Sequence, residues 1–359
     1  MRNCRDRFPL SVIIPIHRSD LDITRCLLSL SNNPRLDIQI IVAANSNSET
    51  ELRSINAQIP DLPYISLLNI PKAGKSNAIN AALPYVEHKY VLIGDADTIF
   101  VQNGINRCME KLYADDRLVA ITGIVDPIVC NTISAVQKFE YRRIFRIFKS
   151  FWNHFQANLI ISGCAGIFKV EALREVGPYD CCTLGEDFEI TMRLHEYHLR
   201  NRIPYKIEYV DLVIAKTDVP RSLKALINQR GRWFAGQVDV IWKYRKILLH
   251  PLWYRRIMTP FVLLILFEMM STYIKWILVG IGIWISVLTN TFFLRVFLMT
   301  EISFALFEFV FNLCLGKRVK IKGVVSILWM TCLLTAIQFV LKDTNLIIAM
   351  KMRKENKWE

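Results

Sequence analysis

The N-terminal two thirds of the chain alternate short apolar runs with segments of helical spacing. Three compact apolar runs have the length of buried strands: residues 10–16, 38–44 and 90–93. Between them, apolar positions recur every three to four residues in residues 23–30 and 76–83, which predicts helices. This alternation is typical of an α/β sheet whose parallel strands are joined by crossover helices. We therefore predict an α/β fold with ligand-binding residues just beyond the carboxyl ends of the strands.

The last third of the chain has a different pattern. Residues 259–286 and 292–315 are apolar and long enough to cross a bilayer, whereas we expect the shorter stretch 324–341 to lie in the interface or to re-enter the membrane. The two longer segments carry charged residues, which either line a passage or pair with one another. We expect a catalytic domain over residues 1–250 and C-terminal α-helical membrane segments, with a basic tail, over residues 251–359.

The distribution of charge orients this predicted membrane region. Residues 316–322 form a basic loop, and the positive-inside rule assigns such a loop to the cytoplasm. Two spans before the loop put the catalytic domain on the same side. No apolar core of signal-peptide length occurs near the N-terminus. We therefore expect an integral protein of the bacterial inner, or plasma, membrane with a cytoplasmic catalytic domain.

Composition narrows the class of partner. Apolar residues make up 52% of the 359 residues, and the formal net charge is +13. Such a charge suits nucleic acid or an anionic lipid surface, and the apolar C-terminal third favours lipid. No RNA-binding signature, helix-turn-helix pattern or zinc-ligand spacing occurs, so we expect no nucleic acid partner. The nine cysteines include no CxxC pair, which predicts reduced thiols.

A long segment rich in aromatic and basic residues lies between these two parts. Residues 134–158 place both kinds of residue at helical spacing. The pattern predicts a long helix that either covers the active site or contacts a membrane surface. An amphipathic core helix has the same pattern, and the sequence does not separate these interpretations.

Two acidic motifs are candidates for chemistry. Asp95 and Asp97 follow the third predicted strand and can hold a divalent cation together with diphosphate oxygens, although two aspartates in a turn often only cap a helix. Glu186 and Asp187 precede a helical segment. Asp187 can act as the general base for an acceptor hydroxyl, or it can cap the helix, which local grounds alone favour.

Basic residues supply further candidates. Lys72 and Lys75 stand before a predicted helix, where cations and helix-terminal amides bind phosphate, or where the loop is simply solvated. Gln229, Arg232 and Trp233 share one helical face. This face suits diphosphate and sugar binding, but a basic helix beside a membrane contains the same residue types.

The small residues of segment 162–166 predict a strand that another group approaches closely. Gly163 and Cys164 lie in this segment. The approaching group is either a sugar ring or another strand.

Taken in order, these motifs resemble the family 2 glycosyltransferases of the processive, membrane-embedded type, which includes cellulose, chitin, hyaluronan and poly-N-acetylglucosamine synthases. The resemblance runs from about residue 10 to the C-terminus. Its most specific part is Glu186-Asp187 followed by Gln229, Arg232 and Trp233 ahead of apolar segments. The resemblance implies a GT-A-type nucleotide-sugar-binding domain and an inverting transfer by single displacement.

The resemblance also implies roles for individual residues. It assigns Asp95 and Asp97 to a Mg²⁺ or Mn²⁺ ion and the donor diphosphate, and it assigns general base catalysis to Asp187 beside Glu186. Donor binding is expected at Pro15, His17, Ala44, Lys72, Lys75, Asp95 and Asp97. Acceptor or diphosphate binding is expected at Gly163, Cys164, Gln229, Arg232 and Trp233.

The chain departs from the family pattern on the donor side. Ala43 and Ala44 stand where the family usually has two aspartates, the second of which contacts the nucleotide base. His17 falls where the family usually has Tyr-Asn-Glu, and it either stacks on a base or is an ordinary loop residue. We favour a UDP-sugar as the donor. Because of these changes, the identity of the nucleotide base stays open. No membrane helix precedes the domain, so a membrane partner subunit is a further expectation.

The leading hypothesis is an enzyme that transfers a sugar to a growing polysaccharide or lipid-linked acceptor among membrane lipids. The reduced membrane part favours an alternative, a lipid glycosyltransferase that adds one sugar and stops. Ala43 and Ala44 favour another, a catalytically inactive subunit of a synthase complex.

Overall fold

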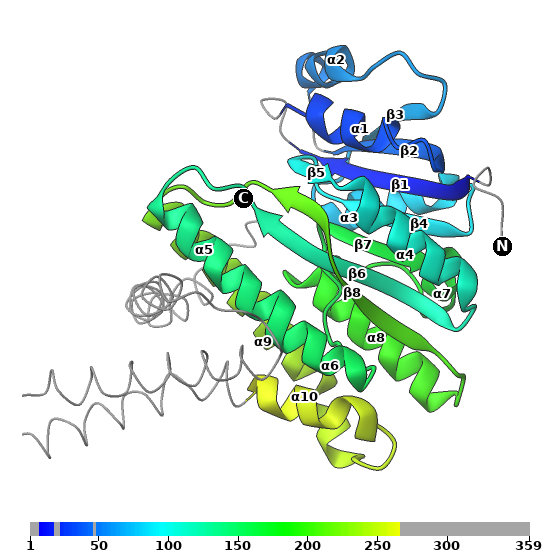
Figure 1. Ribbon diagram of the computed structural model, residues 1–359, viewed down its shortest axis with the longest axis vertical. Coiled ribbons are helices and arrows are strands. Elements are labelled where there is room, and N and C mark those ends of the chain that lie inside the picture. The colour runs from blue at the N-terminus through cyan, green and yellow to red at the C-terminus, as the bar shows by residue number, and fades with distance from the viewer. Residues whose placement is uncertain (1–6, 18–21, 46–47, 266–359) are drawn as a thin grey trace, which may run out of the picture.

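We analysed a computed structural model of the protein, which describes residues 7–17, 22–45 and 48–265. Eight strands of this part form one sheet in the order β3-β2-β1-β4-β7-β6-β8-β5 (Figure 1). The strands are β1 (Phe8–Ile16), β2 (Leu36–Asn45), β3 (Ile65–Ile70), β4 (Tyr90–Gly94), β5 (Thr98–Phe100), β6 (Leu118–Pro127), β7 (Ala165–Lys169) and β8 (Lys206–Thr217).

The sheet is mixed. β1 pairs in parallel with β2 and β4, β2 pairs in parallel with β3, and β6 pairs in parallel with β8. The pairs β4–β7, β6–β7 and β5–β8 are antiparallel. The three strands predicted from apolar runs are confirmed as β1, β2 and β4, all parallel neighbours. The α/β class is therefore confirmed, while the antiparallel pairings of β7 and β5 were not predicted.

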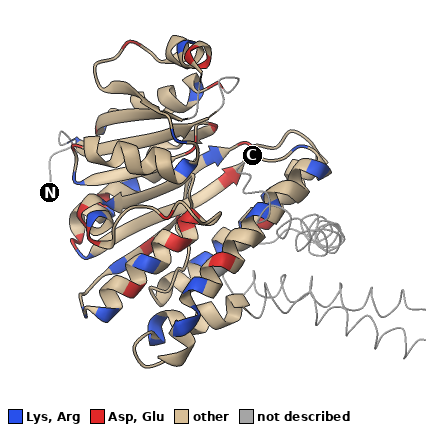
Figure 2. Cartoon of the chain, turned by 180° about the vertical axis from the view of Figure 1, so that it is seen from behind, with Lys and Arg blue, Asp and Glu red and all other residues tan. Residues whose placement is uncertain are grey.

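Helices cover both faces of the sheet. They are α1 (Thr24–Ser31), α2 (Glu49–Gln58), α3 (Lys75–Ala82), α4 (Gln102–Ala114), α5 (Thr132–Arg143), α6 (Ser150–His154), α7 (Val170–Val176), α8 (Glu186–Arg200), α9 (Leu223–Tyr244) and α10 (Arg255–Ile265), with the short turns η1 (Leu83–Tyr85), η2 (Ile144–Lys149) and η3 (Arg245–Leu249). Charged residues lie mostly on helices and at strand ends (Figure 2).

Alternation along the strands explains this layering, because successive side chains of a strand point to opposite faces. Val12 and Ile14 of β1 belong to a core with residues of α1 and α4. Ile13 belongs to a second core, which contains residues of α3, α7 and α8. The strand is buried on both sides, as its continuous apolar run predicted.

The predicted helix over residues 134–158 is present in a modified form. α5 continues into η2, a π-helical turn, and then into α6, which ends at His154. Asn131 caps α5 by accepting a hydrogen bond from the backbone amide of Ser134. Tyr141 and Phe145 are buried, whereas Phe151 is exposed. The segment therefore has one face in the core and another at the surface.

The third core lies where α8, α9 and α10 meet. Phe188 and Met192 of α8 pack with Val240 of α9 and with Ile257 and Phe261 of α10. The first residues after position 250 therefore pack on the catalytic part of the chain.

Most of the predicted membrane region lies outside the described residues, including segments 292–315 and 324–341 and all but the start of segment 259–286. Within the part that the structure describes, no helix has the length and apolar character that a bilayer span requires. Six cysteines lie in that part, all as free thiols: Cys26, Cys108, Cys130, Cys164, Cys181 and Cys182.

Candidate active site

The acidic pair lies just beyond the carboxyl end of β4, as predicted. Asp97 accepts a hydrogen bond from the Thr217 hydroxyl at 3.3 Å, which links the pair to the end of β8. Burial raises the pKa of Asp97 to about 6, and the charge of Asp95 adds to this effect. The two carboxylates thus stand in a partly buried place where their negative charges repel each other.

Lys75, the first residue of α3, connects this pair to the rest of the site. Its ammonium lies 2.6 Å from an Asp95 carboxylate oxygen and 3.3 Å from a Glu186 oxygen, and it donates to the Gly163 carbonyl at 3.1 Å. Burial opposes the charge of Lys75, but Asp95 and Glu186 outweigh it and raise the pKa of Lys75. Gly74, which precedes α3, has a φ of 110°, a backbone conformation that glycine adopts readily and residues with a side chain rarely adopt.

Glu186 and Asp187 begin α8, as predicted. Asp187 accepts hydrogen bonds from the backbone amides of Gly163, at 3.1 Å, and of Phe188, at 2.7 Å. Burial raises the pKa of Asp187 to about 6, the charge of Glu186 adds to this, and Lys75 opposes it. A carboxylate held by two amides, with a pKa close to neutrality, is suited to accept a proton from a hydroxyl.

Gly163 allows these groups to come together. A side-chain carbon at this position would lie 3.2 Å from the Asp187 Cβ and 3.3 Å from the Lys75 ammonium. Cys164 follows and is half-buried. The predicted strand over residues 162–166 is wrong in its start, because β7 begins at Ala165 and the two preceding residues form a turn. The amide and the carbonyl of Gly163 are therefore free to bind Asp187 and Lys75.

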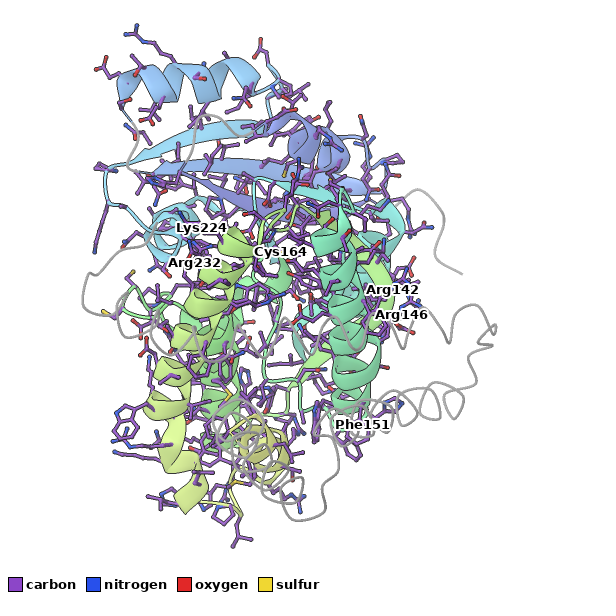
Figure 3. The ribbon with its side chains drawn as sticks, turned by 90° about the vertical axis from the view of Figure 1, so that its left-hand side faces the viewer. Arg142, Arg146, Phe151, Cys164, Lys224 and Arg232 are labelled. Atoms are coloured by element: carbon purple, nitrogen blue, oxygen red, sulfur yellow. The ribbon has the colours of Figure 1, made fainter. Side chains whose placement is uncertain are left out.

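The helix α9 carries the third predicted motif on the other side of Cys164. In Figure 3, Cys164 lies between α9, with Lys224 and Arg232, and the helix with Arg142 and Arg146. Trp233 is 41% exposed, so its indole is available to a ligand. Arg232 is half-buried, and no contact joins it to the carboxylates within the described residues.

Sequence reasoning missed Arg230, which lies within the same motif. Arg230 is buried, forms an ion pair with Glu140 of α5, and stacks at 4.1 Å on the ring of Trp233. Its Nε and Nη1 atoms have no hydrogen-bond partner in the described part of the chain, and the same holds for Oε1 of Gln229. The helical spacing of the motif did not identify Arg230, because only its partner across the fold distinguishes it from Arg232.

The donor-side predictions fall at the carboxyl ends of β1 and β2. His17 Nδ1 and the Asn45 carbonyl are 2.9 Å apart, and the Asn45 side chain donates to the Gly74 carbonyl at 2.7 Å. Sequence reasoning did not select Asn45, which joins the end of β2 to the turn before Lys75. Ala44 is fully buried in the core, so its side chain does not reach this edge.

Two other donor-side candidates lie at the same edge without joining the charged cluster. Pro15 is half-buried near the end of β1, and Lys72 is exposed. The Asn45 side chain contacts Lys72 only through its carbonyl, at 3.5 Å.

The oxygen atoms of the acidic pair suit a divalent cation that is also coordinated by a bound ligand. Among the described residues, no group of three or more His, Cys, Asp or Glu side chains is placed to hold a metal ion by itself. Asp95 and Asp97 supply hard oxygen atoms two residues apart, of the kind that bind Mg²⁺ or Mn²⁺. Diphosphate oxygens would have to complete the coordination.

The mixed sheet, with polar groups at the carboxyl ends of β1 and β2 and the acidic pair at the end of β4, defines a GT-A-like glycosyltransferase domain. Residues 11–177 match the sequence model of the Glycosyl transferase family 2. The chain therefore contains a family 2 glycosyltransferase domain.

Relatives among characterised proteins agree with this assignment. The chain is 26% identical over 325 residues to the poly-beta-1,6-N-acetyl-D-glucosamine synthase of Staphylococcus epidermidis, covering 86% of this chain and 74% of that protein. It is 31% identical over 208 residues to the enzyme of the same name from Staphylococcus aureus, covering 57% of this chain and 48% of that protein. The chain is homologous to these polysaccharide synthases.

The fold is also present in a solved structure, the mannosyltransferase PcManGT from Pyrobaculum calidifontis in complex with GDP-Man and Mn²⁺. The two structures superpose with a TM-score of 0.59 at 15% identity, over 98% of this chain and 89% of that one. This likeness supports the GT-A-like fold.

Proposed function

We propose that this protein is a metal-dependent, inverting glycosyltransferase that transfers a sugar from a nucleotide-sugar donor to a growing polysaccharide or lipid-linked acceptor at a membrane. The observation that carries the proposal is the convergence of four charged side chains around Gly163: Lys75, Asp95, Glu186 and Asp187. Such a cluster combines phosphate binding with a candidate base, and both are required to transfer a sugar from a diphosphate.

On the donor side, Lys75 supplies a fixed positive charge for the diphosphate, and Asp95 with Asp97 would hold the Mg²⁺ or Mn²⁺ ion. The bound ion would neutralise charge on the leaving diphosphate. Asn45 fixes the turn before Lys75 through the Gly74 carbonyl. The donor is thus bound at the edge of the sheet formed by the ends of β1, β2 and β4.

On the acceptor side, Asp187 takes the proton of the attacking hydroxyl. The hydroxyl oxygen forms a bond to the anomeric carbon as the bond from that carbon to the diphosphate oxygen breaks, so the configuration inverts. Two backbone amides hold the Asp187 carboxylate in place. Trp233, exposed on α9, offers a face on which an acceptor sugar can stack.

The homologous synthases support N-acetylglucosamine as the first sugar to test. The family resemblance favours UDP as the first nucleotide. The apolar stretches beyond residue 258 support a membrane location with the catalytic part, residues 1–250, on the cytoplasmic face of a bacterial inner membrane. Membrane lipids and a membrane partner subunit belong to the same proposal.

The test is donor turnover by the purified full chain in detergent or lipid. A panel of UDP-, GDP- and dTDP-sugars is supplied with Mg²⁺, Mn²⁺ or a chelator, and nucleotide release and product length are followed. We expect metal-dependent turnover of one donor, which the Asp97→Asn variant loses. Absence of turnover with every donor, despite a folded protein, would contradict the proposal. A product with only one added sugar would replace polymer synthesis with single addition.

A further inference from the structure

The helix formed by α5, η2 and α6 places Lys149 differently from two arginines of the same segment. Arg142 and Arg146 are exposed, and Figure 3 shows both pointing away from Cys164. Lys149 ends η2 and is half-buried. In a continuous α-helix, residues three and four apart share a face, so Lys149 would point outward with Arg146. A π-helical turn holds more residues and shifts this register, and such turns are frequent at functional sites.

The contacts of Lys149 lead into the active site. Its ammonium donates to the Ser162 hydroxyl at 3.1 Å and lies 4.6 Å from the centre of the Phe145 ring. The charge of Lys149 interacts with Asp187, the candidate base. Ser162 directly precedes Gly163, whose amide donates to that carboxylate. Lys149 and Lys75 therefore reach the same short turn from two different helices.

Lys149 lacks the partner that a buried lysine normally has. Among the residues that the structure describes, no carboxylate forms an ion pair with it, whereas Lys75 is bound to two. Burial lowers the pKa of Lys149 to about 8, and the charge of Asp187 opposes this. A partly buried ammonium without an ion pair costs free energy. Proteins keep such unfavourable buried charges at sites where the charge contributes to the reaction.

We propose that Lys149 is a positioning residue for sugar transfer: its hydrogen bond holds Ser162 ahead of Gly163, and its charge stabilises the ionised Asp187 carboxylate. This inference rests on the proposed function. The charged groups that face Asp187 are Glu186 on the same helix, Lys75 of α3 and Lys149 of η2. Of the two cations, Lys75 is bound to Asp95 and Glu186, whereas Lys149 forms no ion pair with a carboxylate in the described residues.

The test compares three variants of the full chain: Lys149→Met, Lys149→Arg and the matched control Arg146→Met. Thermal unfolding first establishes that each is folded, and then kcat and donor KM are measured across pH with the donor that the wild type turns over. In Lys149→Met we expect kcat to fall about tenfold or more below neutral pH, with the acid limb shifted to higher pH, because Asp187 loses a positive neighbour. Donor KM should change little.

The other two variants separate positioning from mere packing. Lys149→Arg should restore most of the activity and the position of the acid limb, since arginine also carries a positive charge. Arg146→Met should behave as the wild type. An unshifted acid limb and unchanged kcat in Lys149→Met would overturn the inference while leaving the proposed function intact. An inactive but folded wild type would contradict both.

Discussion

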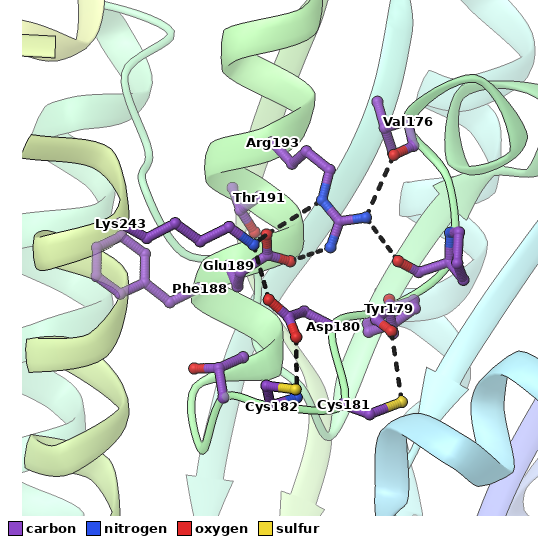
Figure 4. A network of polar contacts seen from close by, with 12 residues as sticks. Val176, Tyr179, Asp180, Cys181, Cys182, Phe188, Glu189, Thr191, Arg193 and Lys243 are labelled. Carbon is purple, nitrogen blue, oxygen red and sulfur yellow. Dashed lines mark hydrogen bonds and ion pairs between the residues drawn. The ribbon is translucent and has the colours of Figure 1, made fainter. Parts of the chain in front are cut away.

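Two carboxylates stand two residues apart near the start of α8, and their surroundings differ. Asp187 is half-buried and accepts hydrogen bonds from backbone amides, with its positive neighbours at a greater distance. Glu189 is fully buried and binds Arg193 and Lys243 directly (Figure 4). The Tyr244 hydroxyl also donates to it, at 3.0 Å. Asp180 extends this network by binding Lys243 at 2.7 Å.

The difference separates a reactive carboxylate from a structural one. Glu189 has two cations and a hydroxyl, so its charge is compensated, and it joins α8 to α9. Asp187 is left with a raised pKa, and its carboxylate has retained the capacity to accept a proton. Perturbed carboxylates of this kind gather at functional sites, while paired ones stabilise the fold. If this distinction holds, substitution of Asp187 should affect activity and substitution of Glu189 should affect stability.

The largest effect is expected from Asp187→Asn. The amide is nearly isosteric but cannot take the proton of the acceptor hydroxyl, so kcat should fall about a thousandfold. Thermal stability should be unchanged or higher, because the variant removes a charge that burial disfavours. Paired measurements of kcat and the unfolding midpoint check both parts. Full activity in this variant would show that another group is the base.

Glu189→Gln should have the opposite profile. Arg193 and Lys243 would lose their shared buried anion, and breaking a buried pair costs about 3 kcal/mol or more. The unfolding midpoint should fall by several degrees, while kcat at low temperature stays close to that of the wild type. The measurement is thermal unfolding with activity in parallel. If stability were unchanged and activity lost, Glu189 would belong to the catalytic site. The distinction between a reactive Asp187 and a structural Glu189 would then be wrong.

The pH dependence of stability gives a third test. The pKa of Asp187 is raised from 3.8 to about 6, so the folded state favours its protonated form. Stability from this group is fully present below pH 3.8 and is lost as pH rises through about 6. Asp187→Asn has no such loss, so its advantage over the wild type should grow by about 1–3 kcal/mol between these values. Unfolding curves at several pH values measure it; a constant difference would contradict the shift.

The strands that could be predicted from the sequence are those whose burial produces an apolar run in the sequence. β1, β4 and the part of β2 from Ile40 onward are largely buried on both faces, so each contains an apolar run that ends at the site. β8 instead alternates between buried and exposed positions and includes charged residues such as Glu208 and Asp211. Its pairing with β6 also contains register shifts, which no local pattern specifies.

The residues of the candidate site likewise fall into those that local sequence patterns predict and those that they do not. Asp95, Asp97, Glu186 and Asp187 follow strand ends or begin a helix, so their placement could be predicted from local patterns. Lys149 could not be predicted, because the π-helical turn before it breaks the helical register on which such reasoning depends. Arg230 and Glu189 acquire their roles from partners far away in the chain, Glu140 and Lys243, and spacing within one helix does not contain that information.

The smallest effect is expected from Lys243→Met, which removes one cation from Glu189 and leaves the other. Arg193 and the Tyr244 hydroxyl would still bind the carboxylate, and the Lys243 side chain is 45% exposed, so water already screens its charge. We therefore expect a loss of about 1 kcal/mol, between the effects of a surface pair and a buried one. The exposed Lys246 provides a control, because Lys246→Met should change stability by less than about 0.5 kcal/mol. A loss as large as that of Glu189→Gln would mean that Lys243, and not Arg193, compensates the charge of Glu189, and that α8 and α9 depend on a single ion pair.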